Sequence, residues 1–199
     1  MRLIAFGESF VTGVGDPEHL GWVGRALRGR RAVTLYNLGV RGATTSKIAG
    51  LWRREAETRL VAEEPCRIVF SFGVNDTWHE DGVARVAPAQ SLLNARAMLT
   101  EAGGLCPVLL VGPPPVPDAG RHARIEALNE NLKALCVRLQ VPFIDVFRPL
   151  AVDGLWAAEA AAWDGAHPGA AGYQRMAELV AAHPAWRRFT LAETAAPDD

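Results

Sequence analysis

Short apolar runs alternate along the chain with longer stretches in which apolar residues recur at steps of three and four. Five of the runs are predicted to be strands, at residues 3–6, 32–36, 67–72, 108–111 and 143–146. Runs this short and this apolar are typical of strands that are covered on both faces.

The longer stretches predict helices at residues 21–29, 46–62, 86–102, 122–139 and 168–182. The clearest apolar stripe consists of Ile125, Leu128, Leu132, Leu135 and Leu139. These positions share one face of a helix, which would pack against a sheet. Strands that alternate with helices of this length indicate an α/β fold with a parallel sheet and helices on both of its faces. The order of the strands stays open.

The chain has 199 residues, which suits one domain over residues 1–189 and a frayed tail at 190–199. It carries 21 basic and 22 acidic residues, and this balance disfavours nucleic acid as a partner. Three cysteines without a C-x-x-C pair favour a reducing, cytoplasmic location. No apolar run is long enough for a membrane span. Whether the chain forms a homo-oligomer stays open.

Ser9 is the serine best placed for chemistry. Ligands of an open α/β sheet bind beyond the carboxyl ends of its strands. Ser9 follows the first predicted strand at a strand-to-helix corner. The other three serines fit a core position (Ser71), a helix cap (Ser46) and a helix (Ser91). A plain helix N-cap is the alternative for Ser9.

His167 differs from the other four histidines, which sit in polar or loop surroundings. It directly precedes the last predicted helix, and Asp164 lies three residues upstream. One tight turn could bring the Asp164 carboxylate to Nδ1 of the imidazole, where it would fix the tautomer and stabilise the imidazolium. Any surface turn can hold an aspartate and a histidine in this way, so the pair alone is a weak signal.

Three groups at the same predicted edge of the sheet are candidate donors to the oxyanion of an acyl-transfer reaction. They are the backbone amides of Ser9 and Gly39 and the side-chain amide of Asn75. Gly39 and Asn75 could each be an ordinary turn residue. A nucleophile, a base and two donors that all follow the ends of elements are nevertheless an uncommon combination.

These segments resemble the four sequence blocks of the SGNH hydrolases, the GDSL-type lipase/esterase family, which carry Ser, Gly, Asn and His. They read Gly-Glu-Ser-Phe at 7–10, Asn-Leu-Gly-Val-Arg-Gly at 37–42, Gly-Val-Asn-Asp at 73–76 and Asp-Gly-Ala-His-Pro at 164–168. The blocks span most of the chain, and the set is far more specific than any one of them.

The resemblance implies a three-layer α/β/α sandwich with a five-stranded parallel sheet in flavodoxin-like order. It also implies a serine hydrolase without cofactor or metal, in which Ser9 is the nucleophile, His167 the base and Asp164 its partner. The amides of Ser9 and Gly39 and the side chain of Asn75 would form the oxyanion hole. Glu8 stands where the family usually has Asp, which puts the fine positioning of the Ser9 loop in doubt.

A small ester with a short acyl chain is the expected substrate, because few insertions interrupt the α/β pattern and no apolar lid is evident. Trp78 and Trp163 are candidate substrate-binding residues, with packing as the alternative for both. Sugar acetates, thioesters and lysophospholipids stay open as other ester substrates.

Two other functions compete with this interpretation. A metal-dependent hydrolase would need carboxylate and imidazole ligands, for which the candidates are Asp76, His79, Glu80, Asp81, Asp164 and His167. The first four of these also fit a solvated loop. The second rival is a non-catalytic binding module on the same fold, but such a chain would normally have lost Ser9 or His167.

Overall fold

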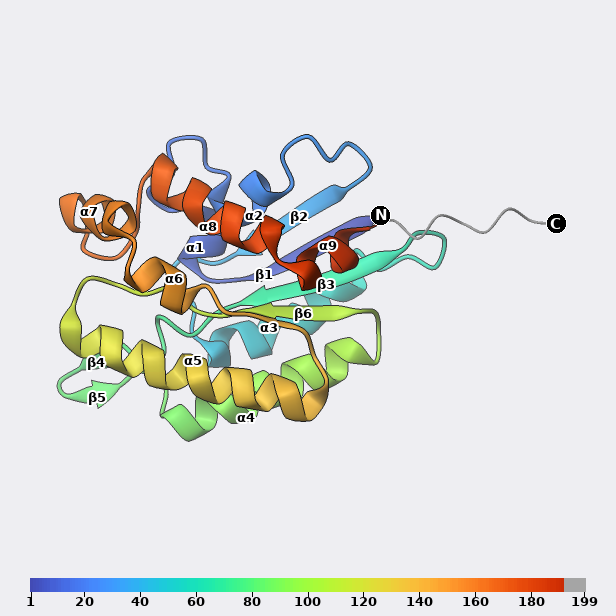
Figure 1. Ribbon diagram of the computed structural model, residues 1–199. Helices are drawn as coiled ribbons and strands as arrows, with labels where there is room; N and C mark the ends of the chain where they lie inside the picture. Colours follow the sequence, from blue (N-terminus) through green and yellow to red (C-terminus); the bar gives the residue numbers. More distant parts are fainter. Residues whose placement is uncertain (192–199) are drawn as a thin grey trace.

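The computed structural model describes residues 1–191, which form a five-stranded parallel sheet with helices on both faces (Figure 1). The strands are β1 (Arg2–Gly7), β2 (Thr34–Gly39), β3 (Cys66–Ser71), β6 (Val108–Val111) and β7 (Phe143–Ile144). Their order in space is β2-β1-β3-β6-β7, and every neighbouring pair is parallel. This is the flavodoxin-like order, so the predicted fold class is confirmed.

Two layers of helices enclose the sheet (Figure 1). One face is covered by α2 (Gly21–Ala26), α6 (Phe147–Ala151), α7 (Gly154–Ala162), α8 (Ala170–Ala182) and α9 (Pro184–Thr190). The other face is covered by α3 (Thr45–Glu57), α4 (Pro88–Gly103) and α5 (Ala119–Leu139).

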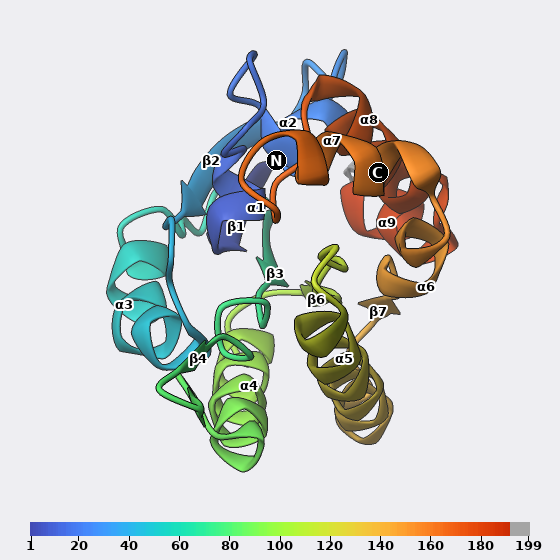
Figure 2. The same cartoon turned by 90° about the vertical axis from the view of Figure 1, so that its left-hand side faces the viewer.

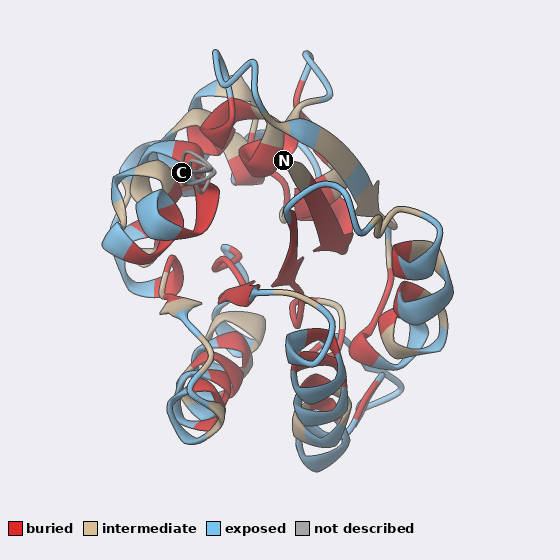
Figure 3. Cartoon of the chain, turned by 90° about the vertical axis from the view of Figure 1, so that its right-hand side faces the viewer, coloured by how far each residue is buried: buried red, intermediate tan, exposed pale blue. Residues whose placement is uncertain are grey.

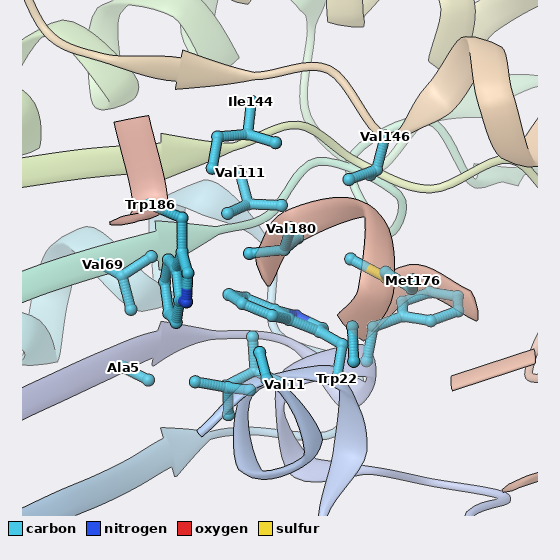
Figure 4. Packing of buried hydrophobic residues seen from close by; sticks show 14 of the residues in the cluster. Ala5, Val11, Trp22, Val69, Val111, Ile144, Val146, Met176, Val180 and Trp186 are labelled. Atoms are coloured by element: carbon cyan, nitrogen blue, oxygen red, sulfur yellow. The ribbon is translucent and has the colours of Figure 1, made fainter. Parts of the chain in front are cut away.

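Alternate side chains of the central strands enter two separate cores. In β1, Leu3 points to the side of α2 and α8, whereas Ile4 points to the side of α3 and α4. β3 and β6 alternate in the same way, so the central strands are buried on both faces (Figure 3). On the α8 side the core closes around Trp22, which meets Trp186 edge-on with ring centroids 5.8 Å apart (Figure 4). Each fully buried aliphatic side chain in these cores, such as Leu3 or Ile4, contributes about 1.5–3 kcal/mol to the free energy of folding.

Several element boundaries differ from the sequence prediction. The second strand runs over Thr34–Gly39 instead of 32–36, because its pairing with β1 sets its register, and Gly39 therefore ends the strand instead of following it. The helix predicted at 46–62 ends at Glu57, and the one predicted at 168–182 begins at Ala170. The helix predicted at 122–139 begins at Ala119, because Asp118 caps it.

Short elements are absent from the prediction, because a helix of one or two turns shows no clear apolar period. They are α1 (Ser9–Thr12), α6, α7, α9 and the hairpin of β4 (His79–Glu80) and β5 (Val83–Ala84). α9 reaches Thr190, so the predicted tail at 190–199 begins too early, and residues 192–199 lie outside the described residues. No helix within residues 1–191 has the length and apolar character needed to cross a membrane.

The carboxyl ends of the strands lie at one end of the molecule, together with α1, α7 and the β4–β5 hairpin (Figures 1 and 2). Ligands of parallel α/β sheets bind at this end. The fold therefore brings the four sequence blocks to one edge of the sheet.

A buried ion pair holds α2 against the loop that follows α1. Nη2 of Arg25 lies 2.6 Å from Oδ1 of Asp16, and Nε donates to Oδ2 at 3.0 Å. Replacing Arg25 by alanine would leave a buried carboxylate without its counter-charge, so we expect the free energy of unfolding to fall by about 3 kcal/mol in urea titrations. Arg28→Ala is the control, because Arg28 pairs with Glu18 at the surface and such pairs contribute about 0–1 kcal/mol. Equal losses in the two variants would contradict this prediction.

Candidate active site

Ser9 sits at the corner between β1 and α1. It is the first residue of α1, and the N-cap is Glu8, whose backbone is extended (φ −106°, ψ −157°). The Ser9 side chain is buried, and its Oγ lies 2.6 Å from Nε2 of His167. The alternative of a plain N-cap is therefore wrong, because Glu8 occupies the cap position and the Ser9 hydroxyl faces the imidazole.

A tight turn that begins at Asp164 holds His167. Oδ1 of Asp164 accepts hydrogen bonds from the backbone amides of Ala166 at 3.0 Å and of His167 at 2.9 Å. Oδ2 lies 2.7 Å from Nδ1 of the same histidine. Gly165 has φ +76°, a left-handed conformation that glycine adopts without strain. One carboxylate thus fixes both the backbone and the ring of His167, and the proton on Nδ1 leaves Nε2 free to accept from Ser9.

Aromatic contacts keep the imidazole in place. The ring centroid of Phe10 lies 4.8 Å from that of His167, and the Trp163 centroid lies 5.9 Å away. The hydroxyl of Tyr173 on α8 donates to the Val14 carbonyl at 2.7 Å, which ties α8 to the loop after α1. The contacts of Phe10 and Val14 with His167 and Tyr173 join the same two segments as the Ser9–His167 hydrogen bond, whose residues are 158 positions apart.

The electrostatics of the site favour a neutral imidazole beside an ionised carboxylate. Burial lowers the pKa of His167, the Asp164 carboxylate raises it, and the charges of Arg41 and Arg121 lower it again, so the net pKa lies below its ordinary value. Partial burial raises the pKa of Asp164, but hydrogen bonds from His167 and Ala166 lower it more, and its net pKa is also below the ordinary value. The site can therefore pass a proton from the Ser9 hydroxyl to His167 at neutral pH.

Glu8 is buried directly behind Ser9 and organises the loop that follows β3. Its Oε1 accepts from the Val74 amide at 2.9 Å. Its Oε2 accepts from the backbone amide of Asn75 at 3.0 Å and from Nδ2 of Asn75 at 2.6 Å. Burial raises the pKa of Glu8 to about 8, although these three N–H donors favour its ionised form. Glutamate at this position thus provides a carboxyl group that joins the Ser9 corner to Asn75.

The candidate oxyanion donors lie against the Ser9 corner, but protein acceptors occupy two of them. Nδ2 of Asn75 donates to Ala43 at 3.1 Å as well as to Glu8. The Gly39 amide donates to Oδ1 of Asn37 at 3.1 Å. A substrate oxygen would have to take the place of Ala43 and Asn37 as acceptors.

Gly39 approaches α1 so closely that no side chain fits there. A Cβ atom on Gly39 would lie 2.6 Å from Oγ1 of Thr12 and 3.0 Å from the carbonyl oxygen of Glu8. Asn37 secures this approach, because its Nδ2 donates to the Val11 carbonyl at 2.7 Å while its Oδ1 accepts from the Gly39 amide. Sequence reasoning missed this role of Asn37, and its place two residues before Gly39 is the signal that could have revealed it.

Trp163 lies against His167, and Trp78 lies near Asp164. Trp78 is 44% exposed and Trp163 is 56% exposed, so neither is a core residue. Trp163 faces the imidazole, whereas Trp78 and Asp164 line the same surface hollow. A role for either tryptophan in binding substrate stays a prediction.

The residues of the alternative metal site do not form one cluster, although Asp164 and His167 are hydrogen-bonded to each other. The Asp76 carboxylate is buried and accepts hydrogen bonds from the amide and hydroxyl of Thr45 and from the hydroxyl of Ser91. His79 and Glu80 are exposed on β4. In the part of the chain that the structure describes, no three His, Cys, Asp or Glu side chains are placed to hold a metal ion. The geometry gives the metal alternative no support.

Comparison with known proteins points to one family. Residues 5–175 match the GDSL-like lipase/acylhydrolase family. No curated protein matches the chain significantly. Among similar solved structures, a member of the lipolytic protein G-D-S-L family from Veillonella parvula has a TM-score of 0.73 and 19% identity, covering 90% of this chain and 96% of that chain.

Two further structures share the fold. An acetylxylan esterase from Geobacillus stearothermophilus has a TM-score of 0.70 and 19% identity, covering 89% of this chain and 91% of that chain. A lipase/acylhydrolase from Enterococcus faecalis has a TM-score of 0.69 and 25% identity, covering 91% of this chain and 94% of that chain. With the family match spanning most of its length, the chain belongs to the GDSL-like lipase/acylhydrolase family.

Proposed function

We propose that this protein hydrolyses small carboxylic esters through an acyl-enzyme intermediate formed on Ser9. The observation that carries the proposal is the continuous hydrogen-bonded series from Ser9 Oγ through His167 to Asp164, with distances of 2.6 and 2.7 Å. A serine nucleophile needs a base within this reach and a third group that orients the base. Membership of a hydrolase family supports the same chemistry.

In the first half-reaction Ser9 Oγ attacks the ester carbonyl carbon while Nε2 of His167 takes the hydroxyl proton. The tetrahedral intermediate collapses, and the alcohol leaves with the proton that His167 returns to it. Water then attacks the acyl-enzyme and gives a proton to His167, which passes it back to Ser9 as the carboxylic acid departs. Asp164 stays ionised throughout and stabilises the imidazolium.

The oxyanion would be stabilised by the amides of Ser9 and Gly39 and by the side chain of Asn75. Asn75 can donate when the substrate oxygen replaces the Ala43 carbonyl, while its short bond to Glu8 keeps the amide group in position. Preorganised donors of this kind each stabilise the transition state by about 3 kcal/mol.

A short acyl chain fits the surroundings of the site. The hollow beside Asp164 has a volume of about 330 Å³, and its other lining residues are Trp78, His79, Asp118, Arg121, Arg124 and Gly165. A long alkyl chain placed there would desolvate charged groups without compensating hydrogen bonds. The likeness to an acetylxylan esterase favours acetyl as the acyl group. Sugar acetates, thioesters and lysophospholipids are the alternative substrates.

A series of 4-nitrophenyl esters tests this substrate class. We expect kcat/KM to be highest for acyl chains of two to about four carbons, because the charged hollow disfavours longer alkyl groups. Activity should survive EDTA, since the proposed steps use only groups of the protein and water. A maximum at twelve or more carbons would contradict the short-acyl proposal, and loss of activity with EDTA would revive the metal alternative.

The pH dependence of kcat/KM should report the ionisation of His167. The base must be neutral, so kcat/KM should fall as the pH drops through the His167 pKa. Since burial and the two arginine charges lower this pKa, the midpoint should lie below the ordinary histidine value of about 6.5. Glu8→Gln removes the titratable group at position 8 and should leave the midpoint of the pH profile unchanged. Arg41→Gln removes a charge that lowers the His167 pKa and should raise the midpoint. A midpoint that disappears in Glu8→Gln would assign the limb to Glu8 instead.

A further inference from the structure

Arg121 is a half-buried cation beside the site for which the proposed reaction has no use. It lies in the first turn of α5, and its guanidinium covers the Trp78 ring with Cζ 4.3 Å from the centroid. Its Nε is buried and has no hydrogen-bond partner within residues 1–191. A buried donor without a partner costs free energy, and the rest of the half-buried guanidinium borders a hollow from which a ligand could reach it.

The carboxyl groups around Arg121 accept hydrogen bonds from groups other than its guanidinium. Glu8 accepts three N–H groups, and Asp164 holds the ring and backbone of His167. Asp118 caps α5 and accepts from the backbone amide of Arg121 rather than from its guanidinium. These charges attract Arg121 at longer range, and burial lowers its pKa. An arginine remains charged even so.

Arg121 lines the hollow that also contains Asp164, and Arg124 lies on the same wall. Arg124 uses its Nε to bind the Thr77 carbonyl at 3.0 Å, which fixes its guanidinium next to the hollow. Two guanidinium groups therefore border a space of about 330 Å³ that opens beside the catalytic carboxylate. Because the Trp78 face is covered by Arg121, that face is not open for stacking against a sugar ring.

Resting on the proposed ester hydrolysis, we propose that this hollow is a subsite for an anionic group of the substrate, a carboxylate or a phosphate, bound by Arg121 and assisted by Arg124. A guanidinium presents paired donors that match two oxygens of such an anion. The substrate is then an ester whose acyl or alcohol part carries a negative charge. Hydrolysis itself is unchanged, with one water consumed and one carboxylic acid and one alcohol released.

Two pairs of esters test this proposal on the wild-type protein. On the acyl side, mono(4-nitrophenyl) glutarate is compared with its methyl ester, and on the alcohol side 4-acetoxybenzoate is compared with its methyl ester. Each kcat/KM is divided by the rate constant for hydroxide hydrolysis, which removes intrinsic reactivity. We expect the anionic member to be preferred about tenfold or more in at least one pair, and the preference to shrink in 0.5 M NaCl. Competition by inorganic phosphate against acetate shows whether phosphate or carboxylate binds better.

Arg121→Gln should reduce the preference for the anionic ester about tenfold, and Arg121→Lys should restore part of it. Arg138→Gln, an exposed arginine near the other end of α5, is the matched control and should leave the preference unchanged. Measurement at pH 9 keeps His167 neutral in every variant, which excludes effects through its pKa. Preference for the neutral ester in both pairs, or a preference that Arg121→Gln does not reduce, overturns the subsite. Failure to hydrolyse any ester would instead refute the proposed function.

Discussion

Replacing Ser9 by alanine should lower kcat for a short 4-nitrophenyl ester by about 10⁴-fold or more. The substitution removes the atom that bonds to the acyl carbon, and only the oxyanion donors and substrate binding would remain. The fold should persist, because Ser9 is the first residue of the short helix α1 and its Oγ serves the contact with His167 rather than a helix cap. Steady-state kinetics on the purified variant, with thermal unfolding in parallel, provide the measurement.

Ser46→Ala is the matched control for this experiment. Ser46 is an exposed serine in the first turn of α3, and its hydroxyl accepts from Asn94 at 3.0 Å. It should retain wild-type kinetics. Wild-type turnover by Ser9→Ala would remove Ser9 from the reaction, and with it the acyl-enzyme proposal.

Replacing Asn75 by alanine should lower kcat by about 10²–10³-fold with little change in KM. The donor strengthens its bond as negative charge develops on the carbonyl oxygen, so its loss raises the barrier more than it weakens substrate binding. The structure adds a second expected effect, because Nδ2 of Asn75 also donates to Glu8 at 2.6 Å. We expect the free energy of unfolding to fall by about 1–3 kcal/mol, since Glu8 loses one of its three donors.

Kinetics and urea titration on the same preparation separate these two effects. Asn131→Ala is the control, because this exposed asparagine on α5 donates to the Ala127 carbonyl of its own helix. A variant that loses stability but keeps its turnover number would show that Asn75 supports Glu8 and does not bind the oxyanion.

The features that could be predicted from the sequence are those that local patterns encode. Buried strands appear as apolar runs, and the rule that ligands bind beyond the carboxyl ends of parallel strands selects Ser9. Asp164 and His167 lie three residues apart, so a single turn can join them, as it does here. The strand-helix alternation and the family resemblance together predict the confirmed sheet.

Contacts between distant segments could not be predicted in the same way. Glu8 binds the amides of Val74 and Asn75, which are 66 and 67 positions away in the sequence. The second strand is predicted at 32–36 but lies at Thr34–Gly39, because only its pairing with β1 shows that it continues to Gly39. Arg121 gives no sequence signal, since its significance arises from the stack on Trp78 and from a donor that has no partner among residues 1–191.

Covalent labelling tests the nucleophile most directly. A fluorophosphonate probe, followed by mass spectrometry of the digested protein, should place one phosphonyl group on the peptide that contains Ser9. Labelling should weaken as the pH falls below the His167 pKa, because the imidazole must be neutral to activate the hydroxyl. Probe found on another residue, or intact protein that hydrolyses esters yet stays unlabelled at Ser9, would contradict the proposed mechanism.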